Sequence, residues 1–105
     1  MSKHRSQENI AADILSIVKK EPKKTHIMYR ANLSYALLCK YLDKLEIAGL
    51  ITYRTDDTVY ELTERGLVYL ERYAEYENLK NQVENSKSSL IKKGALLNKI
   101  LGVDE

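Results

Sequence analysis

The sequence predicts a mainly α-helical fold that contains one small β-hairpin and continues into a long C-terminal coiled-coil helix. Apolar residues recur at helical spacing in three segments of the first half of the chain. Two short β-prone runs follow Gly49 and flank a polar turn. Between Gly66 and Lys93 the chain has no proline and no glycine. With 105 residues, 44% of them hydrophobic, the chain suits one compact domain and one extended element.

The first two predicted helices lie on either side of Pro22. The first runs from about Gln7 to Lys20, and its apolar face consists of Ile10, Ala11, Ile14, Leu15, Ile17 and Val18. It ends before Pro22, because proline disfavours the helical conformation of the residue that precedes it. A shorter second helix follows, with Thr25 as its expected N-cap and Ile27, Met28 and Ala31 facing inward.

The third predicted helix, residues 34–48, is the segment around which the rest of the domain is expected to pack. Ser34 is its expected N-cap. Leu38, Leu42 and Leu45 follow at spacings of four and three, so they form one apolar stripe opposite a wet face. Gly49 is expected to supply the left-handed conformation that ends the helix.

Beyond Gly49 the sequence predicts a hairpin and then one long helix. The strands of the hairpin are residues 50–54 and 59–62, joined by a polar turn. Thr63 is the expected cap of the next helix, and Gly66 in its first turn suggests close packing. The segment ALLNKIL either continues this helix or forms a separate short one. We therefore divide the chain into residues 1–66, a compact domain, and residues 67–105, a long dimerisation helix.

The long helix carries an apolar seam that exceeds the core available to it. Leu67 and Leu70 are expected to pack back on the domain. The seam follows the alternating three and four spacing of a coiled coil, with Arg72 interrupting it and Ser86 weakening it. Its members are Tyr69, Tyr76, Leu79, Val83 and Leu90. We predict a homodimer through this helix; the alternative is a helix that folds back on its own domain.

Charge is distributed unevenly along the chain. Residues 1–55 hold ten Lys/Arg against five Asp/Glu, whereas residues 56–105 hold seven against ten. A basic first half joined to a mildly acidic tail suits binding to a polyanion, but charge alone favours an ordinary solvated surface. The single cysteine, Cys39, rules out an intrachain disulfide and a thiolate zinc cluster. It is most simply a small hydrophobe, with oxidation that modulates binding as the alternative.

Other classes of protein find little support. No apolar run has the length of a membrane span, and the N-terminus lacks a signal-peptide core, so we expect a cytoplasmic protein. His4 and His26 are the only histidines, and no Gly-rich phosphate loop or nucleophile grouping is present. We therefore expect no enzyme activity, cofactor, metal or small-molecule ligand.

Three helices, a hairpin and a long helix match a winged helix-turn-helix, with the third helix in the DNA major groove and the hairpin as the wing. The segment IMYRANLSYALLCKYLDKL also resembles the archaeal family of small dimeric winged helix-turn-helix DNA-binding proteins, the ten-kilodalton chromatin-associated type with an ArnR-like winged helix domain. The resemblance extends from Ile27 to about Leu70. It implies two heads joined by an antiparallel coiled coil of the last helices.

The candidate DNA contacts are polar or aromatic side chains on the second and third helices and the wing. They are Lys23, Lys24, Thr25, His26, Arg30, Ser34, Tyr35, Lys40, Tyr41, Lys44 and Arg54. For Tyr41 the alternative is packing against the wing, and for Lys44 it is simple solvation. We expect Tyr29 to pack in the core. Asp56 and Asp57 at the wing tip oppose contact with phosphate, so the wing either stops short of the DNA or touches it only through Arg54.

The function predicted from these features is DNA binding by a dimeric transcriptional regulator or a chromatin-associated architectural factor, located in the cytoplasm on the nucleoid. Ala36 and Leu37 offer no hydrogen-bonding side chains, so we expect modest sequence selectivity and a large contribution from phosphates. The alternative is a winged-helix module that joins a protein assembly without touching DNA.

Overall fold

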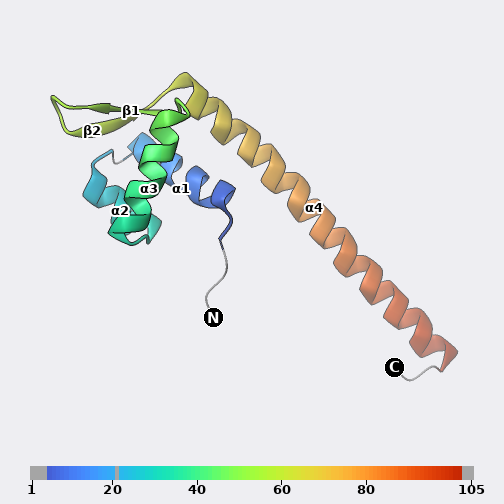
Figure 1. Cartoon of the computed structure of the whole chain (residues 1–105). Helices are drawn as coiled ribbons and strands as arrows, with labels where there is room; N and C mark the ends of the chain where they lie inside the picture. The colour runs from blue at the N-terminus through green and yellow to red at the C-terminus, as the bar shows by residue number, and fades with distance from the viewer. Residues whose placement is uncertain (1–4, 21, 103–105) are drawn as a thin grey trace. The chain divides into compact units, whose positions relative to one another are not determined.

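The structure is a computed structural model that describes residues 5–20 and 22–102. It has four helices and one antiparallel hairpin in the order α1, α2, α3, β1, β2, α4 within those residues (Figure 1). The chain forms two compact units, Met1–Tyr73 and Ala74–Glu105. The first holds the three short helices, the hairpin and the start of α4. The mainly α fold with a hairpin and a long last helix is therefore confirmed.

Helix α1 spans Gln7–Lys20, the predicted bounds. Helix α2 spans Lys24–Ala31. The prediction that Thr25 caps it was wrong, because the helix begins one residue earlier. Lys23 is the N-cap, and its side chain makes no capping hydrogen bond. The helix ends at Asn32, whose left-handed backbone (φ 56°) allows its N–H to bond the Tyr29 carbonyl at 3.2 Å. Asn32 thus turns the chain into α3.

Helix α3 spans Tyr35–Ile47, and both of its predicted ends are confirmed. The Ser34 hydroxyl accepts a hydrogen bond from the Leu37 N–H at 3.2 Å, which satisfies one of the free donors of the first turn. Gly49 has a φ of 79°, so it supplies the left-handed conformation that leads the chain out of the helix.

One apolar core joins these elements. It is built mainly from aliphatic side chains of α1, α2, α3 and the hairpin, and its most enclosed members are Ile14, Leu15, Ile27, Leu38, Leu42 and Ile51. The predicted stripe of α3, Leu38, Leu42 and Leu45, lies wholly in this core. Burial of one such side chain stabilises a fold by about 1.5–3 kcal/mol relative to its exposure. The core therefore fixes which face of α3 remains in solvent.

The hairpin pairs β1 (Ile51–Arg54) with β2 (Val59–Leu62). In the register Tyr53 lies opposite Tyr60, and Arg54 lies opposite Val59. Because side chains alternate along a strand, the two tyrosines occupy one face and Arg54 the other. The Tyr60 N–H donates to the Pro22 carbonyl at 3.0 Å. This bond ties the hairpin to the segment that precedes α2.

Helix α4 spans Glu64–Leu101, so ALLNKIL continues it rather than forming a separate helix. The Thr63 hydroxyl caps it by accepting from the Gly66 N–H at 3.0 Å, as predicted. Leu70 packs against the core as expected, whereas Leu67 is 41% exposed.

Within the first unit, the start of α4 is held against α1 by two tyrosines. The Tyr69 hydroxyl donates to the Glu8 carbonyl at 3.1 Å, and the Asn9 amide donates to the Tyr73 hydroxyl at 3.0 Å. Tyr69 also packs against the core, so its assignment to the dimer seam is corrected to packing within the head. The reason is that the first turns of α4 still lie over α1, which uses this side of the helix.

Candidate nucleic-acid interface

The solvent face of α3 presents most of the side chains predicted for the major groove. Ser34, Tyr35, Lys40 and Lys44 are exposed. Tyr35 is 61% exposed at the N-terminus of the helix, where free N–H groups favour an anionic oxygen. Asp43 and Glu46 share the exposed surface of α3, so its charge is mixed.

Tyr41 is the exception among these residues. It is only 7% exposed and belongs to the core, so the packing alternative describes it and its assignment as a DNA contact is corrected. The Lys44 ammonium lies 5.7 Å from the centre of the Tyr41 ring, within the range of a cation–π contact. Lys44 remains exposed and keeps its charge at the surface.

Helix α2 contributes a second group of basic and polar side chains. Lys23, Thr25, His26 and Arg30 are exposed, as binding to a phosphate backbone requires. Tyr29 is 76% exposed, so the expectation that it packs in the core was wrong. Ile27 and Ala31 occupy the buried face of α2, so Tyr29 lies on the exposed side of the helix, next to Arg30.

Lys24 differs from its neighbours because it connects α2 to α3. Its ammonium donates to the Tyr35 hydroxyl at 3.3 Å and lies 4.8 Å from the centre of the same ring. Hydrogen bonds to Tyr35 and then to Cys39 raise the pKa of Lys24, which favours its charged form. The structure thus brings together two predicted contacts, Lys24 and Tyr35, from different helices.

On the wing, Arg54 is engaged by acidic neighbours. Its guanidinium donates to the Glu61 carboxylate at 2.9 Å and lies 3.5 Å from that of Asp57. The hydrogen bond to Glu61, followed by the charges of Glu61 and Asp57, raises the pKa of Arg54. The positive charge of Arg54 is therefore partly neutralised by one carboxylate of β2 and one of the hairpin turn.

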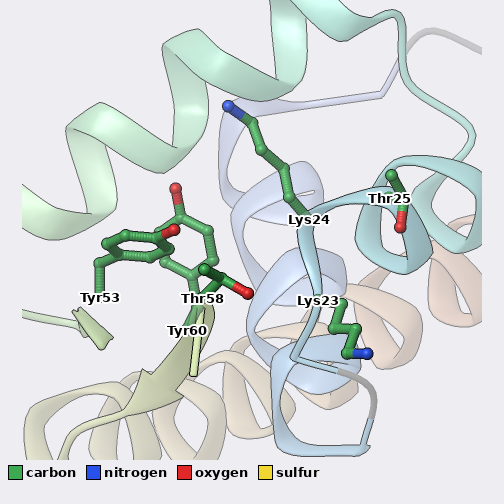
Figure 2. Close-up of a pocket in the computed structure, with 6 residues that line it drawn as sticks. All are labelled: Lys23, Lys24, Thr25, Tyr53, Thr58 and Tyr60. Atoms are coloured by element: carbon green, nitrogen blue, oxygen red, sulfur yellow. The ribbon is translucent and has the colours of Figure 1, made fainter. Parts of the chain in front are cut away.

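The opposite face of the wing borders a pocket of about 530 Å³ that sequence analysis missed. The residues that line it come from the start of α2 and from the hairpin, and they are Lys23, Lys24, Thr25, Tyr53, Thr58 and Tyr60 (Figure 2). The Tyr53 and Tyr60 rings are 4.8 Å apart at an interplanar angle of 51°. The alternation of the strands puts both tyrosines on one face, but only the fold brings that face to α2.

In the second unit, α4 exposes the apolar side chains predicted for the seam. The exposed fractions are 51% for Tyr76, 62% for Leu79, 54% for Val83 and 73% for Leu90. More apolar side chains follow along the helix, and all are more than half exposed: Ile91, Leu96, Leu97, Ile100 and Leu101. Such a run of exposed leucine and isoleucine is typical of an interaction surface.

In residues 5–20 and 22–102, no cluster of three His, Cys, Asp or Glu side chains has the arrangement of a metal site. Over the same ranges, no helix combines the length and the apolarity that a bilayer span needs. His4 lies outside the described residues.

Comparisons with known proteins give one consistent picture. A family model described as winged helix-turn-helix matches residues 4–81. An uncharacterized protein of Methanocaldococcus jannaschii is 43% identical over 63 residues, which cover 59% of this chain and 63% of the relative. The chain thus spans less than two thirds of the length of this curated relative.

Solved structures show the same fold. Sso10a-2, a DNA-binding protein from Sulfolobus solfataricus, superposes with a TM-score of 0.74 and 27% identity, over 84% of this chain and 95% of that one. The transcriptional regulator BldR from the same organism gives a TM-score of 0.60 and 26% identity, over 89% and 72% of the two chains. The PcaV regulator from Streptomyces coelicolor, 17% identical with a TM-score of 0.61 over 99% and 79%, shares the fold.

Proposed function

The chain belongs to the winged helix-turn-helix family, and from this premise we propose that it binds double-stranded DNA as a homodimeric transcriptional regulator or architectural factor on the nucleoid. The observation that carries the proposal is the exposed, polar face of α3, with Tyr35 and Lys40 in solvent while the opposite stripe is buried. In this family a helix so placed enters the major groove. The DNA-binding protein Sso10a-2 and the regulator BldR, both more than 25% identical to this chain, support it.

The mode of binding that we propose relies strongly on phosphates. The exposed face of α3 mixes Lys40 and Lys44 with Asp43 and Glu46, so it offers few side chains for bidentate contacts with bases. Helix α2 adds Lys23, Thr25, His26 and Arg30 beside it as candidate phosphate contacts. Affinity should therefore depend on salt and discriminate modestly between sequences.

Fluorescence anisotropy with a labelled random duplex tests DNA binding. The logarithm of affinity should fall linearly with the logarithm of salt concentration, with a slope close to the number of phosphates neutralised. Lys40→Ala combined with Lys44→Ala should weaken binding and lower that slope by about two. Lys80→Ala, an exposed lysine in the second unit, is the control for loss of a positive charge. Identical isotherms for the double variant and the wild type would remove α3 from the interface.

The dimer is the second part of the proposal. A single α4 would leave Tyr76, Leu79, Val83 and Leu90 in water, and pairing with a second copy buries them at about 25 cal/mol per Å². Light scattering coupled to size exclusion should give twice the chain mass. Leu79→Glu with Val83→Glu should give monomers. Asn81→Glu with Asn85→Glu adds the same charge outside the seam and should remain dimeric; monomeric wild-type protein would refute the pairing.

A winged-helix module in a protein assembly is the competing function. It is supported by the exposed apolar residues beyond the seam, such as Ile91 and Leu96. The same anisotropy experiment separates the two, because such a module has no need for affinity to duplex DNA at low salt. A dimer without that affinity would favour the assembly role.

A further inference from the structure

The pocket between α2 and the wing has a lining suited to one class of small ligand. Among the described residues that line it, the charged ones are Lys23 and Lys24, and none carries a carboxylate. Four hydroxyl groups, from Thr25, Thr58 and the two tyrosines, complete the polar lining. Phosphate offers three or more acceptor oxygens and a negative charge, which match ammonium and hydroxyl donors.

One donor of the pocket, the Lys24 ammonium, is held in place. Figure 2 shows the Lys24 ammonium and the Tyr60 hydroxyl on the same side of the pocket, whereas the Lys23 ammonium points away from the rings. Lys24 is also anchored by the Tyr35 hydroxyl at 3.3 Å, so its charge is held in place before a ligand arrives. Burial, and then the nearby carboxylates of Glu46 and Asp43, raise the pKa of Tyr60 against the opposing effect of Lys24, so its hydroxyl keeps its proton and remains a donor.

The wing side of the pocket adds a surface for a planar group. Tyr53 is 41% exposed and packs its ring against Tyr60 at 4.8 Å between centres. Aromatic faces of this kind stack on nucleobases with little dependence on which base is present. The volume of about 530 Å³ lies within the usual range for a small-molecule site, and it exceeds what a lone phosphate ion fills.

We infer that this pocket binds a free phosphate ester that carries a planar ring, with a nucleoside monophosphate as the simplest member of the class. Lys24 and the Tyr60 hydroxyl hold the phosphate, and Tyr53 stacks on the ring; the Thr58 hydroxyl already donates to the Asp57 carbonyl at 2.6 Å, so it can only accept from a ligand. The pocket walls, α2 and the wing, are elements of the proposed DNA-binding head. The consequence that such a ligand competes with DNA therefore rests on the proposed function, whereas the binding itself does not.

Titration of the full chain, followed by amide NMR, tests the site with adenosine monophosphate, inorganic phosphate and adenosine as separate probes. Adenosine monophosphate should shift the amides of residues 23–25, 53 and 58 saturably, and bind about tenfold or more tightly than either fragment probe. Tyr53→Leu and Lys24→Gln should each weaken it about tenfold. Thr52→Ala, on the opposite face of the same strand, should bind as the wild type does.

The outcomes separate this inference from the proposed function. No saturable shift with adenosine monophosphate, or equal affinity for inorganic phosphate, would overturn the pocket assignment. Shifts centred on other residues would also overturn it. Saturable binding that is lost in Tyr53→Leu supports the site even if duplex affinity, measured by anisotropy without nucleotide, proves absent. In that case the DNA function fails and the nucleotide site remains.

Discussion

Gly66 shows how one residue without a side chain determines the packing of two elements. A Cβ built there would lie 2.3 Å from the Leu50 carbonyl oxygen and 2.7 Å from Leu62 Cδ1. The Leu62 side chain can adjust, but the backbone oxygen of Leu50 cannot move away cheaply. The start of α4 can therefore approach the hairpin this closely only with glycine at this position.

We expect Gly66→Ala to lower the free energy of unfolding by about 1–3 kcal/mol, because the added methyl group forces the start of α4 away from Leu50 and β2. Gly94→Ala is the matched control, since a Cβ at Gly94 meets no atom within 4 Å. In an exposed helix this change should stabilise by about 0.5–1 kcal/mol. Urea unfolding followed by circular dichroism, at one fixed protein concentration, measures both. Equal effects of the two variants would contradict the close contact.

Buried tyrosines make the stability sensitive to alkaline pH. Burial is the main cause that raises the pKa of Tyr60 above its ordinary value of 10.0, and burial also raises that of Tyr69. Above about pH 10 the unfolded chain releases these protons first, so the free energy of unfolding falls as pH rises. The contribution is fully present below pH 10. Urea titrations between about pH 8 and pH 11 should show this fall, and Tyr60→Phe should make it shallower. A slope unchanged by Tyr60→Phe would count against burial of the phenol.

Side chains at the surface of the core were the hardest to predict from sequence. Tyr41 is buried and Tyr29 is exposed, yet both are tyrosines on short amphipathic helices beside basic residues. Helix α2 has eight residues, so its periodicity defines only a narrow face and does not place Tyr29. Tyr41 instead falls on the buried stripe of the 13-residue α3, beside Leu38, Leu42 and Leu45. By contrast, the leucines of α3 could be placed from spacing alone, because three of them repeat along one stripe.

At the scale of elements, the wing has two faces with different chemistry. One carries Tyr53 and Tyr60 beside the pocket, and the other carries Arg54 with Glu61. The strand residues predicted the hairpin and its alternation. They did not predict the ion pair, since the diagonal contact between Arg54 and Glu61 depends on the register, which the turn of the hairpin determines.

This arrangement predicts that Glu61 restrains the wing. Glu61→Gln should free the Arg54 guanidinium, raise duplex affinity and increase the magnitude of the salt slope by about one phosphate contact. Arg54→Ala alone should change affinity little, because its charge is already engaged. Glu71→Gln, which removes an equal charge from an exposed position of α4, controls for net charge. Equal gains in Glu61→Gln and Glu71→Gln would show that only net charge matters.

Capping residues predicted the starts of two helices correctly and the start of a third incorrectly. Ser34 and Thr63 each accept a hydrogen bond from a first-turn N–H, and both helices begin where those residues predict. Thr25 has the same cap preference, but α2 starts at Lys24 because the bond from Tyr60 to Pro22 positions the preceding segment. A tertiary contact therefore overrides a local preference at this end.

At the scale of the whole molecule, the charge along α4 favours one orientation of the proposed pair. Residues 71–84 hold four Glu against Arg72 and Lys80, whereas residues 85–101 hold four Lys and no acidic side chain. Antiparallel pairing brings the acidic half of one helix beside the basic half of the other. Parallel pairing would align like charges over both halves. The charge pattern thus agrees with the antiparallel coil that the family resemblance implies.

The orientation can be measured with spin labels in a Cys39→Ser background. If the paired stretch runs from Tyr76 to Leu97, its midpoint lies near Ser86. A label at Asn98→Cys should then lie about 35 Å from its partner in an antiparallel pair, at 1.5 Å per residue, and within about 20 Å in a parallel one. Ser86→Cys is the control, because its labels lie close together in either orientation. A short distance at both positions would exclude antiparallel pairing, because antiparallel helices hold the two labels at position 98 far apart. The helices would then be parallel, with like-charged halves side by side despite their repulsion.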